Sequence, residues 1–113
     1  MAATTLAARA EVIDIDWGAD RRFDRNLQIA PGKFAEICGK LAGGAAVKWD
    51  FDAAAPLDFN IHFHEGKKVL FPVKQDGTAK AEGTLAVTLA QDYCWMWTNK
   101  GSGPVSLRVR LAR

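Results

Sequence analysis

Two short segments of the chain bring together side chains that bind metals. The first contains His62 and His64, and the second contains Cys94 and Met96. In a β-strand, residues two apart lie on the same face, so the two imidazoles would project to one side, roughly 7 Å apart along the strand. Imidazole, thiolate and thioether are ligands of copper and other soft metals. The four residues predict a copper or soft-metal site, provided that both segments pair in one sheet with these side chains on the same face.

Neighbouring side chains could support such a site. Asn60 shares the predicted face of the histidines and could orient an imidazole from outside the ligand shell. Trp95 or Trp97 could shield the metal from water. A blue-copper domain uses the same four ligand types, but it takes Cys, one His and Met from a single loop. Because the ligands here come from two separate strands, a cupredoxin is not supported.

The second segment is unusual because both of its faces are apolar. Tyr93, Trp95 and Trp97 alternate with Cys94 and Met96. A strand without a polar face is either covered on both sides or lines a site. Core packing, with Cys94 and Met96 filling gaps, is the alternative to a ligand role. For the histidines the alternative is an ordinary solvated strand face.

The two cysteines leave three possibilities open. Cys38 and Cys94 could form a disulfide, remain as buried thiols, or bind a metal. A disulfide would remove the thiolate from the predicted metal site. It would also indicate an oxidising compartment.

Apolar and polar residues alternate with a period of two along most of the chain, which is typical of strands with one buried face. The spacing predicts an all-β fold, a single antiparallel β-sandwich of about eight strands over residues 21–113. Residues 1–20 are expected to form a flexible tail or a first edge strand. The clearest alternating segments are Val47–Phe51, Leu57–His64, Leu85–Leu89 and Val105–Leu111.

Local features qualify this pattern. The 34–41 segment also fits a helical spacing, so a short helical turn is possible there. Pro72 marks its strand as an edge or a bulge, because proline cannot donate to the ladder. Glu65-Gly66 is expected to form a two-residue hairpin turn, and Asp76-Gly77 to lie in a longer loop.

Composition excludes several classes of function. The chain has 113 residues and a net charge of +2, without a cluster of Lys and Arg. Nucleic acid and a polybasic membrane anchor are therefore not expected as partners. The sequence holds no apolar run of the roughly 20 residues that a membrane-spanning helix needs. It also lacks a nucleophile elbow, a phosphate-binding glycine loop and a zincin motif, so we expect no enzyme.

The first residues bear on localisation. Ala8-Arg9-Ala10 has the A-x-A form of a signal-peptidase site, although no basic region and no real apolar stretch precede it. If the segment is the stub of a trimmed signal peptide, the protein is periplasmic or secreted. If it is a plain tail, the protein is cytoplasmic.

Several turns and strands follow one another in a recognisable order. They are the Pro31-Gly32 turn, Gly43-Gly44 before Val47–Phe51, the acidic-apolar Asp58–Ile61, the aromatic strand ending in Thr98-Asn99, and the closing Val105–Leu111. Over about residues 26 to 112 this order resembles the GOLD domain, a β-sandwich of cargo adaptors of the early secretory pathway and of some lipid-binding proteins. The resemblance implies a binding module for a protein or a small apolar ligand, without metal. His62, His64, Cys94 and Met96 are not part of that family's pattern.

Overall fold

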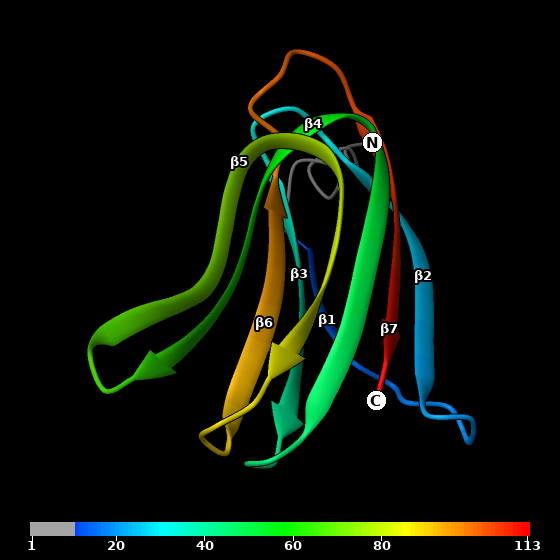
Figure 1. Ribbon diagram of the computed structural model, residues 1–113. Coiled ribbons are helices and arrows are strands. Elements are labelled where there is room, and N and C mark those ends of the chain that lie inside the picture. The colour runs from blue at the N-terminus through cyan, green and yellow to red at the C-terminus, as the bar shows by residue number, and fades with distance from the viewer. Residues whose placement is uncertain (1–10) are drawn as a thin grey trace, which may run out of the picture.

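The computed structural model describes residues 11–113, which form seven strands and no helix (Figure 1). The predicted all-β class is confirmed, but these residues form seven strands instead of about eight, and the pairing is not wholly antiparallel because the first and the third strand run parallel. The short helical turn considered for residues 34–41 is wrong, because this segment is a strand throughout. The strands are β1 (Glu11–Asp14), β2 (Arg22–Ile29), β3 (Phe34–Leu41), β4 (Ala46–Glu65), β5 (Lys68–Ala86), β6 (Gln91–Thr98) and β7 (Val105–Ala112).

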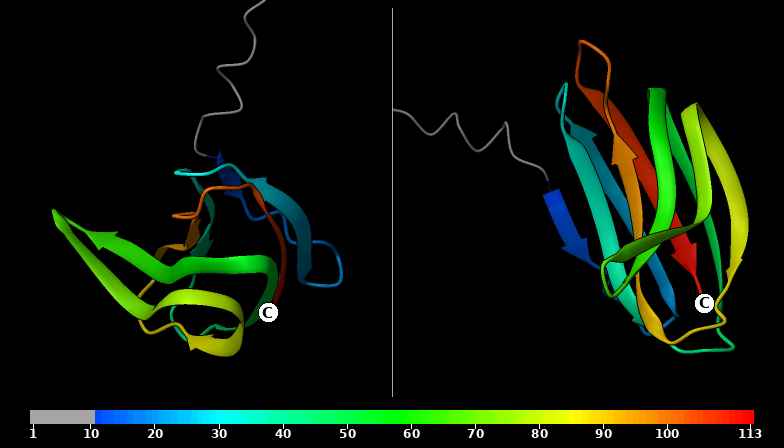
Figure 2. Two further views of the ribbon diagram at one scale, coloured as in Figure 1. Left: turned by 90° about the horizontal axis from the view of Figure 1, so that it is seen from above. Right: turned by 90° about the vertical axis from the view of Figure 1, so that its left-hand side faces the viewer.

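The strands form one sheet that curls around the core (Figures 1 and 2). Their order is β1-β3-β6-β4-β7-β2, with β5 on the other side of β4. All pairings are antiparallel except that of β1 with β3, which is parallel. The short β1 forms one edge of the sheet. The first residues of the predicted tail, 1–10, and with them Ala8-Arg9-Ala10, lie outside the described residues.

The long strand β4 carries the sheet around its bend. Its first half, residues 48–53, pairs with β7, and its second half, residues 58–62, pairs with β6. The sequence predicts two strands here, interrupted at residues 53–56. The structure has one, because β5 pairs with β4 on both sides of the bend and register shifts absorb the change of direction.

The loop predicted at Asp76-Gly77 is also wrong. Both residues lie inside β5, whose backbone is kept extended by its pairing with β4. Gly77 has a φ of 64° and its N–H donates to the Asp58 carboxylate at 2.9 Å. A left-handed residue in a strand is typical of a bulge, and glycine adopts that conformation without steric cost. The aspartate thus satisfies a backbone donor where the ladder is interrupted.

The β4–β5 hairpin contains a second irregularity. Ile61 pairs with Val73 and Phe63 with Leu70, so Phe71 and Pro72 together oppose one residue of β4. The prediction that Pro72 marks a bulge or an edge is confirmed. The predicted hairpin turn was wrong by one residue. Glu65 pairs with Lys68, and the two-residue loop is Gly66-Lys67.

The inner face of the sheet explains the aromatic strand. Trp95 and Trp97 have no exposed surface, and the Trp97 ring packs against those of Phe51 and Phe59, with centroids 5.6 and 5.4 Å away. Strand β6 lies between β3 and β4 at the centre of the sheet.

The part of the chain that the structure describes holds no helix long and apolar enough to cross a membrane.

One glycine of β5 makes room for a core tryptophan. Gly83 pairs with Trp49, and a Cβ atom at Gly83 would lie 2.7 Å from Cζ2 of the indole. We expect Gly83→Val to lower the free energy of unfolding by about 1–3 kcal/mol, because the buried ring must move. Urea unfolding followed by tryptophan fluorescence measures the change. As a control, Gly103→Ala adds a methyl group where no atom lies within 4 Å, so equal losses in both variants would contradict this account.

Candidate functional site

The two segments that carry the predicted ligands meet on one face of the sheet. In the β4–β6 register, His62 lies opposite Cys94, and Asn60 lies opposite Met96. These side chains alternate with buried core residues and therefore lie on the outer face. His64 follows two residues after His62 on the same face of β4. The arrangement on which the metal prediction depended is thus present.

Strand β3 adds a residue that was not predicted. Its register with β6 places Glu36 opposite Met96 and Cys38 opposite Cys94. Glu36 is half-buried, and its Oε2 lies 2.9 Å from Nε2 of His62. The sequence did not indicate Glu36 as part of the site, because residues 34–41 also fit a helical spacing. As a strand, the segment puts Glu36 and Cys38 on one face.

His62 is the centre of this cluster. It is only 5% exposed although it lies on the outer face. Nδ1 donates to Oδ1 of Asn60 at 2.7 Å, which fixes the orientation of the ring. The ring centroid lies 5.9 Å from that of Phe71 and 5.4 Å from that of His64. The solvated-face alternative therefore fails for His62 and describes only His64, which is exposed.

The arrangement around Nε2 has a chemical consequence. When Nδ1 carries the proton donated to Asn60, Nε2 keeps a lone pair, and the Glu36 carboxylate oxygen lies 2.9 Å from it. An imidazole nitrogen and a carboxylate oxygen 2.9 Å apart can share a proton or hold a metal ion between them. Two ligands that bind one ion at 2.0–2.2 Å and at about a right angle are themselves about 3 Å apart. The spacing suits a shared metal.

The cysteines are joined in a disulfide, which settles the alternatives that the sequence left open. Cys38 and Cys94 are directly paired across β3 and β6, with Cα atoms 4.1 Å apart. The prediction of Cys94 as a thiolate ligand therefore does not hold in this oxidised form, because its sulfur is bonded to Cys38. Met96, half-buried, lies beside the disulfide on the same face.

The predicted shielding by tryptophan is wrong. Trp95 and Trp97 lie on the inner face, because alternate residues of β6 point to opposite sides of the sheet. The aromatic cover of His62 comes instead from Phe71, on the hairpin strand β5. This contact depends on the bulge beside Pro72, which strand periodicity alone does not place.

Burial lowers the pKa of His62 below its ordinary value near 6.5. The Glu36 carboxylate opposes this shift, and His64 adds to it. The neutral imidazole is the form that binds metals. The buried environment of His62 therefore favours the state that can accept a metal ion.

The lowered pKa predicts that the metal-free protein loses stability in mild acid. Below pH 6.5 the unfolded chain binds a proton at His62 that the folded protein resists, so the free energy of unfolding falls as the pH drops from 6.5 through the folded pKa. Well above pH 6.5 His62 is neutral in both states, and its contribution to the free energy of unfolding is fully present. Urea unfolding at pH 7.5 and at pH 5.5 measures how much of this free energy is lost in acid. His62→Gln should reduce the difference between these values, and an unchanged difference would contradict the assignment.

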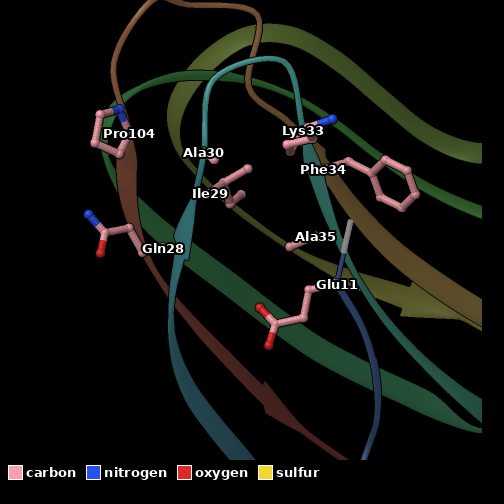
Figure 3. Close-up of a pocket in the computed structure, with 8 residues that line it drawn as sticks. All are labelled: Glu11, Gln28, Ile29, Ala30, Lys33, Phe34, Ala35 and Pro104. Atoms are coloured by element: carbon pink, nitrogen blue, oxygen red, sulfur yellow. The ribbon is translucent and has the colours of Figure 1, made fainter. Parts of the chain in front are cut away.

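A separate surface hollow of about 270 Å³ lies between the start of β1, the β2–β3 turn and the start of β7 (Figure 3). Its walls include Gln28, Ile29, Ala35 and Pro104, and the Glu11 carboxylate lies at its lower side in this view. Phe34 lies on the opposite side of the hollow from Gln28, and its ring points away from Gln28. Among the described residues that line the hollow, Glu11 is the one carboxylate and has no second metal ligand beside it, so these residues do not make a metal site.

No family model and no curated protein matches the chain. The resemblance to the GOLD domain therefore stays a prediction. Solved structures do match the fold. PliG from Aeromonas hydrophila, a periplasmic inhibitor of g-type lysozyme, superposes with a TM-score of 0.68 at 10% identity, over 92% of this chain and 96% of its own.

Two further solved structures resemble the chain less closely. PliG from Salmonella Typhimurium, also a periplasmic inhibitor of g-type lysozyme, gives a TM-score of 0.59 at 9% identity, over 90% and 96% of the two chains. CorA of Methylomicrobium album BG8, described as a surface-associated copper-binding protein, gives 0.55 at 10% identity, over 92% and 98%. Identities this low show a shared all-β fold.

Proposed function

We propose that the protein is a small non-enzymatic binding protein that holds a copper ion on the outer face of β3, β6 and β4. His62, His64 and Glu36 are the ligands in the oxidised protein, and the Met96 thioether lies beside them. The observation that carries the proposal is the 2.9 Å separation of Nε2 of buried His62 and Oε2 of Glu36.

The second imidazole lies beside the first, although the ligand atoms that lie within 4.8 Å of one another belong to Glu36, His62 and Cys94 and do not include His64. The ring centroids of His62 and His64 are 5.4 Å apart and nearly perpendicular. A metal bound to an imidazole nitrogen at about 2.0 Å lies about 3 Å from the ring centroid, so two rings that share one ion have centroids about 5–6 Å apart. Asn60 supports the site as an outer-shell partner, since it holds the opposite nitrogen of His62.

The ligand types favour copper(II) among the divalent metals. Nitrogen and oxygen ligands bind first-row ions with an affinity that rises to copper and falls again at zinc. A thioether at Met96 would add a ligand that also suits copper(I). The copper-binding CorA shares the fold, which supports the proposal at the level of architecture.

We further infer that the protein functions in an oxidising compartment. Its two cysteines form a disulfide, and such bonds persist in the periplasm and outside the cell rather than in the cytosol. The structurally similar proteins named above are described as periplasmic or surface-associated.

Copper titration of the disulfide-bonded protein tests the site. We expect one Cu²⁺ per chain, and a loss of affinity of at least tenfold in His62→Ala and in Glu36→Gln. Competition with a chelator of known affinity, followed by the Cu²⁺ absorption band, measures both changes.

Glu82→Gln is the matched control, because Glu82 is an exposed glutamate on β5, opposite Asp50 and away from the site. Its copper affinity should equal that of the unmodified protein. Copper binding that survives in His62→Ala would place the ion elsewhere and reject the proposed site.

A second candidate is inhibition of another protein through the tip of the β4–β5 hairpin. Figure 1 and the left view of Figure 2 show this hairpin projecting from the body of the sheet. Val69, Leu70 and Phe71 on it are 37–48% exposed, three consecutive large apolar side chains in contact with solvent. Exposed apolar groups of this kind are typical of protein-binding surfaces.

The PliG proteins suggest the probe for this candidate, because they inhibit g-type lysozyme. If the hairpin acts similarly, the unmodified protein inhibits a g-type lysozyme, and Val69→Ser with Leu70→Ser weakens the inhibition at least tenfold while copper binding is kept. An uninhibited lysozyme at a large excess of the protein would reject this second function.

A further inference from the structure

We infer that the Cys38–Cys94 disulfide controls the metal site, because its reduction adds the Cys94 thiolate to the ligands Glu36 and His62. The inference rests on the proposed function only in taking these two residues as ligands. It concerns a second state of the same site, in which the oxidised and the reduced protein prefer different metals.

The ligand atoms are already in place. One carboxylate oxygen of Glu36, one nitrogen of His62 and the Cys94 sulfur lie within 4.8 Å of one another. An ion bound at 2.0–2.3 Å to each of three ligands holds them within about that separation. The disulfide therefore occupies a sulfur that otherwise completes a three-ligand set.

The backbone keeps Cys94 in this position when the bond is broken. Its strand β6 is paired on both sides, with β3 through Cys38 and with β4 through His62. Both ladders consist of backbone hydrogen bonds that do not depend on the disulfide. The freed thiolate thus stays opposite His62.

A reductant can reach the bond from the surface. Both cysteines line an open hollow of about 460 Å³, whose other walls are Asp14, Ile15, Gly39, Lys40 and Asp92. Cys94 itself is 9% exposed. A fully enclosed structural disulfide would offer no such approach.

The redox step is an exchange with a dithiol. One thiolate of the dithiol attacks the protein disulfide, and its second thiol then resolves the mixed disulfide. One S–S bond breaks and one forms. The protein gains two electrons and two protons, and the dithiol loses them. The metal then displaces the proton of the Cys94 thiol.

The change in ligands changes the preferred metal. In the oxidised protein the site offers imidazole and carboxylate, whereas reduction adds a thiolate, which suits Zn²⁺ and copper(I). We expect the reduced protein to bind Zn²⁺ at least tenfold more tightly than the oxidised protein.

Two single substitutions separate the thiolate from the loss of the disulfide. Cys38→Ser and Cys94→Ser both remove the bond, but only Cys38→Ser keeps the thiol that lies against His62. Cys38→Ser should show the tighter Zn²⁺ binding and, with Co²⁺ as a probe, a sulfur-to-cobalt charge-transfer band. Cys94→Ser should show neither.

Thermal unfolding extends the test to variants that fold poorly. A metal that binds the folded state stabilises it, so Zn²⁺ should raise the Tm of Cys38→Ser, or restore its folding, and leave Cys94→Ser unchanged. Equal responses of the two variants overturn the inference.

The two proposals fail separately. If oxidised protein binds Cu²⁺ at His62 while Cys38→Ser gains no Zn²⁺ affinity, the redox control is rejected and the copper site stands. If only Cys38→Ser binds metal, the copper site of the oxidised protein is rejected and the reduced site stands.

Discussion

Removal of the Cys38–Cys94 disulfide is expected to lower the free energy of unfolding by about 4 kcal/mol. The bond joins residues separated by 56 positions, so it restricts a long loop in the unfolded chain. The chain-entropy model gives about 4 kcal/mol for a loop of this length. Urea unfolding of the oxidised and reduced protein, followed by circular dichroism, measures the difference.

A Cys38→Ala, Cys94→Ala double variant provides the control. Its stability should not respond to the reductant, and it should lie close to that of the reduced protein. A loss below about 1 kcal/mol in both would mean that the unfolded chain is already compact around these strands. The entropic account would then be wrong for this protein.

The fold was accessible from the sequence because its periodicity is simple. Strands such as β7, with Val105 and Leu107 inside and Arg108 outside, alternate without interruption. The periodicity could not predict that β4 continues as one strand across its bend. Residues 53–56 break the alternation, and only pairing with the distant β5 keeps that backbone extended.

The site was predictable in part for the same reason. Alternation places His62 and His64 on one face, and Cys94 and Met96 on one face. That these faces coincide follows from the β4–β6 register, which no local pattern specifies. Glu36 and the disulfide enter through β3, a segment whose spacing was compatible with a helix. Ligands contributed by a third strand require the strand order, and this is a long-range property of the chain.

The loop between β6 and β7 is held by a single buried amide, that of Asn99. The residue has no exposed surface. Its Nδ2 donates to the carbonyl oxygens of Ile29 and Gly103 at 2.9 and 2.8 Å, and its Oδ1 accepts from the N–H of Gly101 at 2.9 Å. One side chain therefore closes the loop and joins it to β2.

We expect Asn99→Ala to lower the free energy of unfolding by about 3 kcal/mol. The substitution leaves three backbone groups without these partners, and each unpaired buried group costs about 1–3 kcal/mol, less where water can enter the loop. Asn26→Ala, at an exposed position of β2, is the matched control and should change stability by less than about 0.5 kcal/mol. Because the Asn99 main chain keeps its own hydrogen bonds to Lys33 and Gly32, the loss measures the side chain alone. A change as small as that of the control would mean that water replaces the amide, and that the loop does not depend on Asn99.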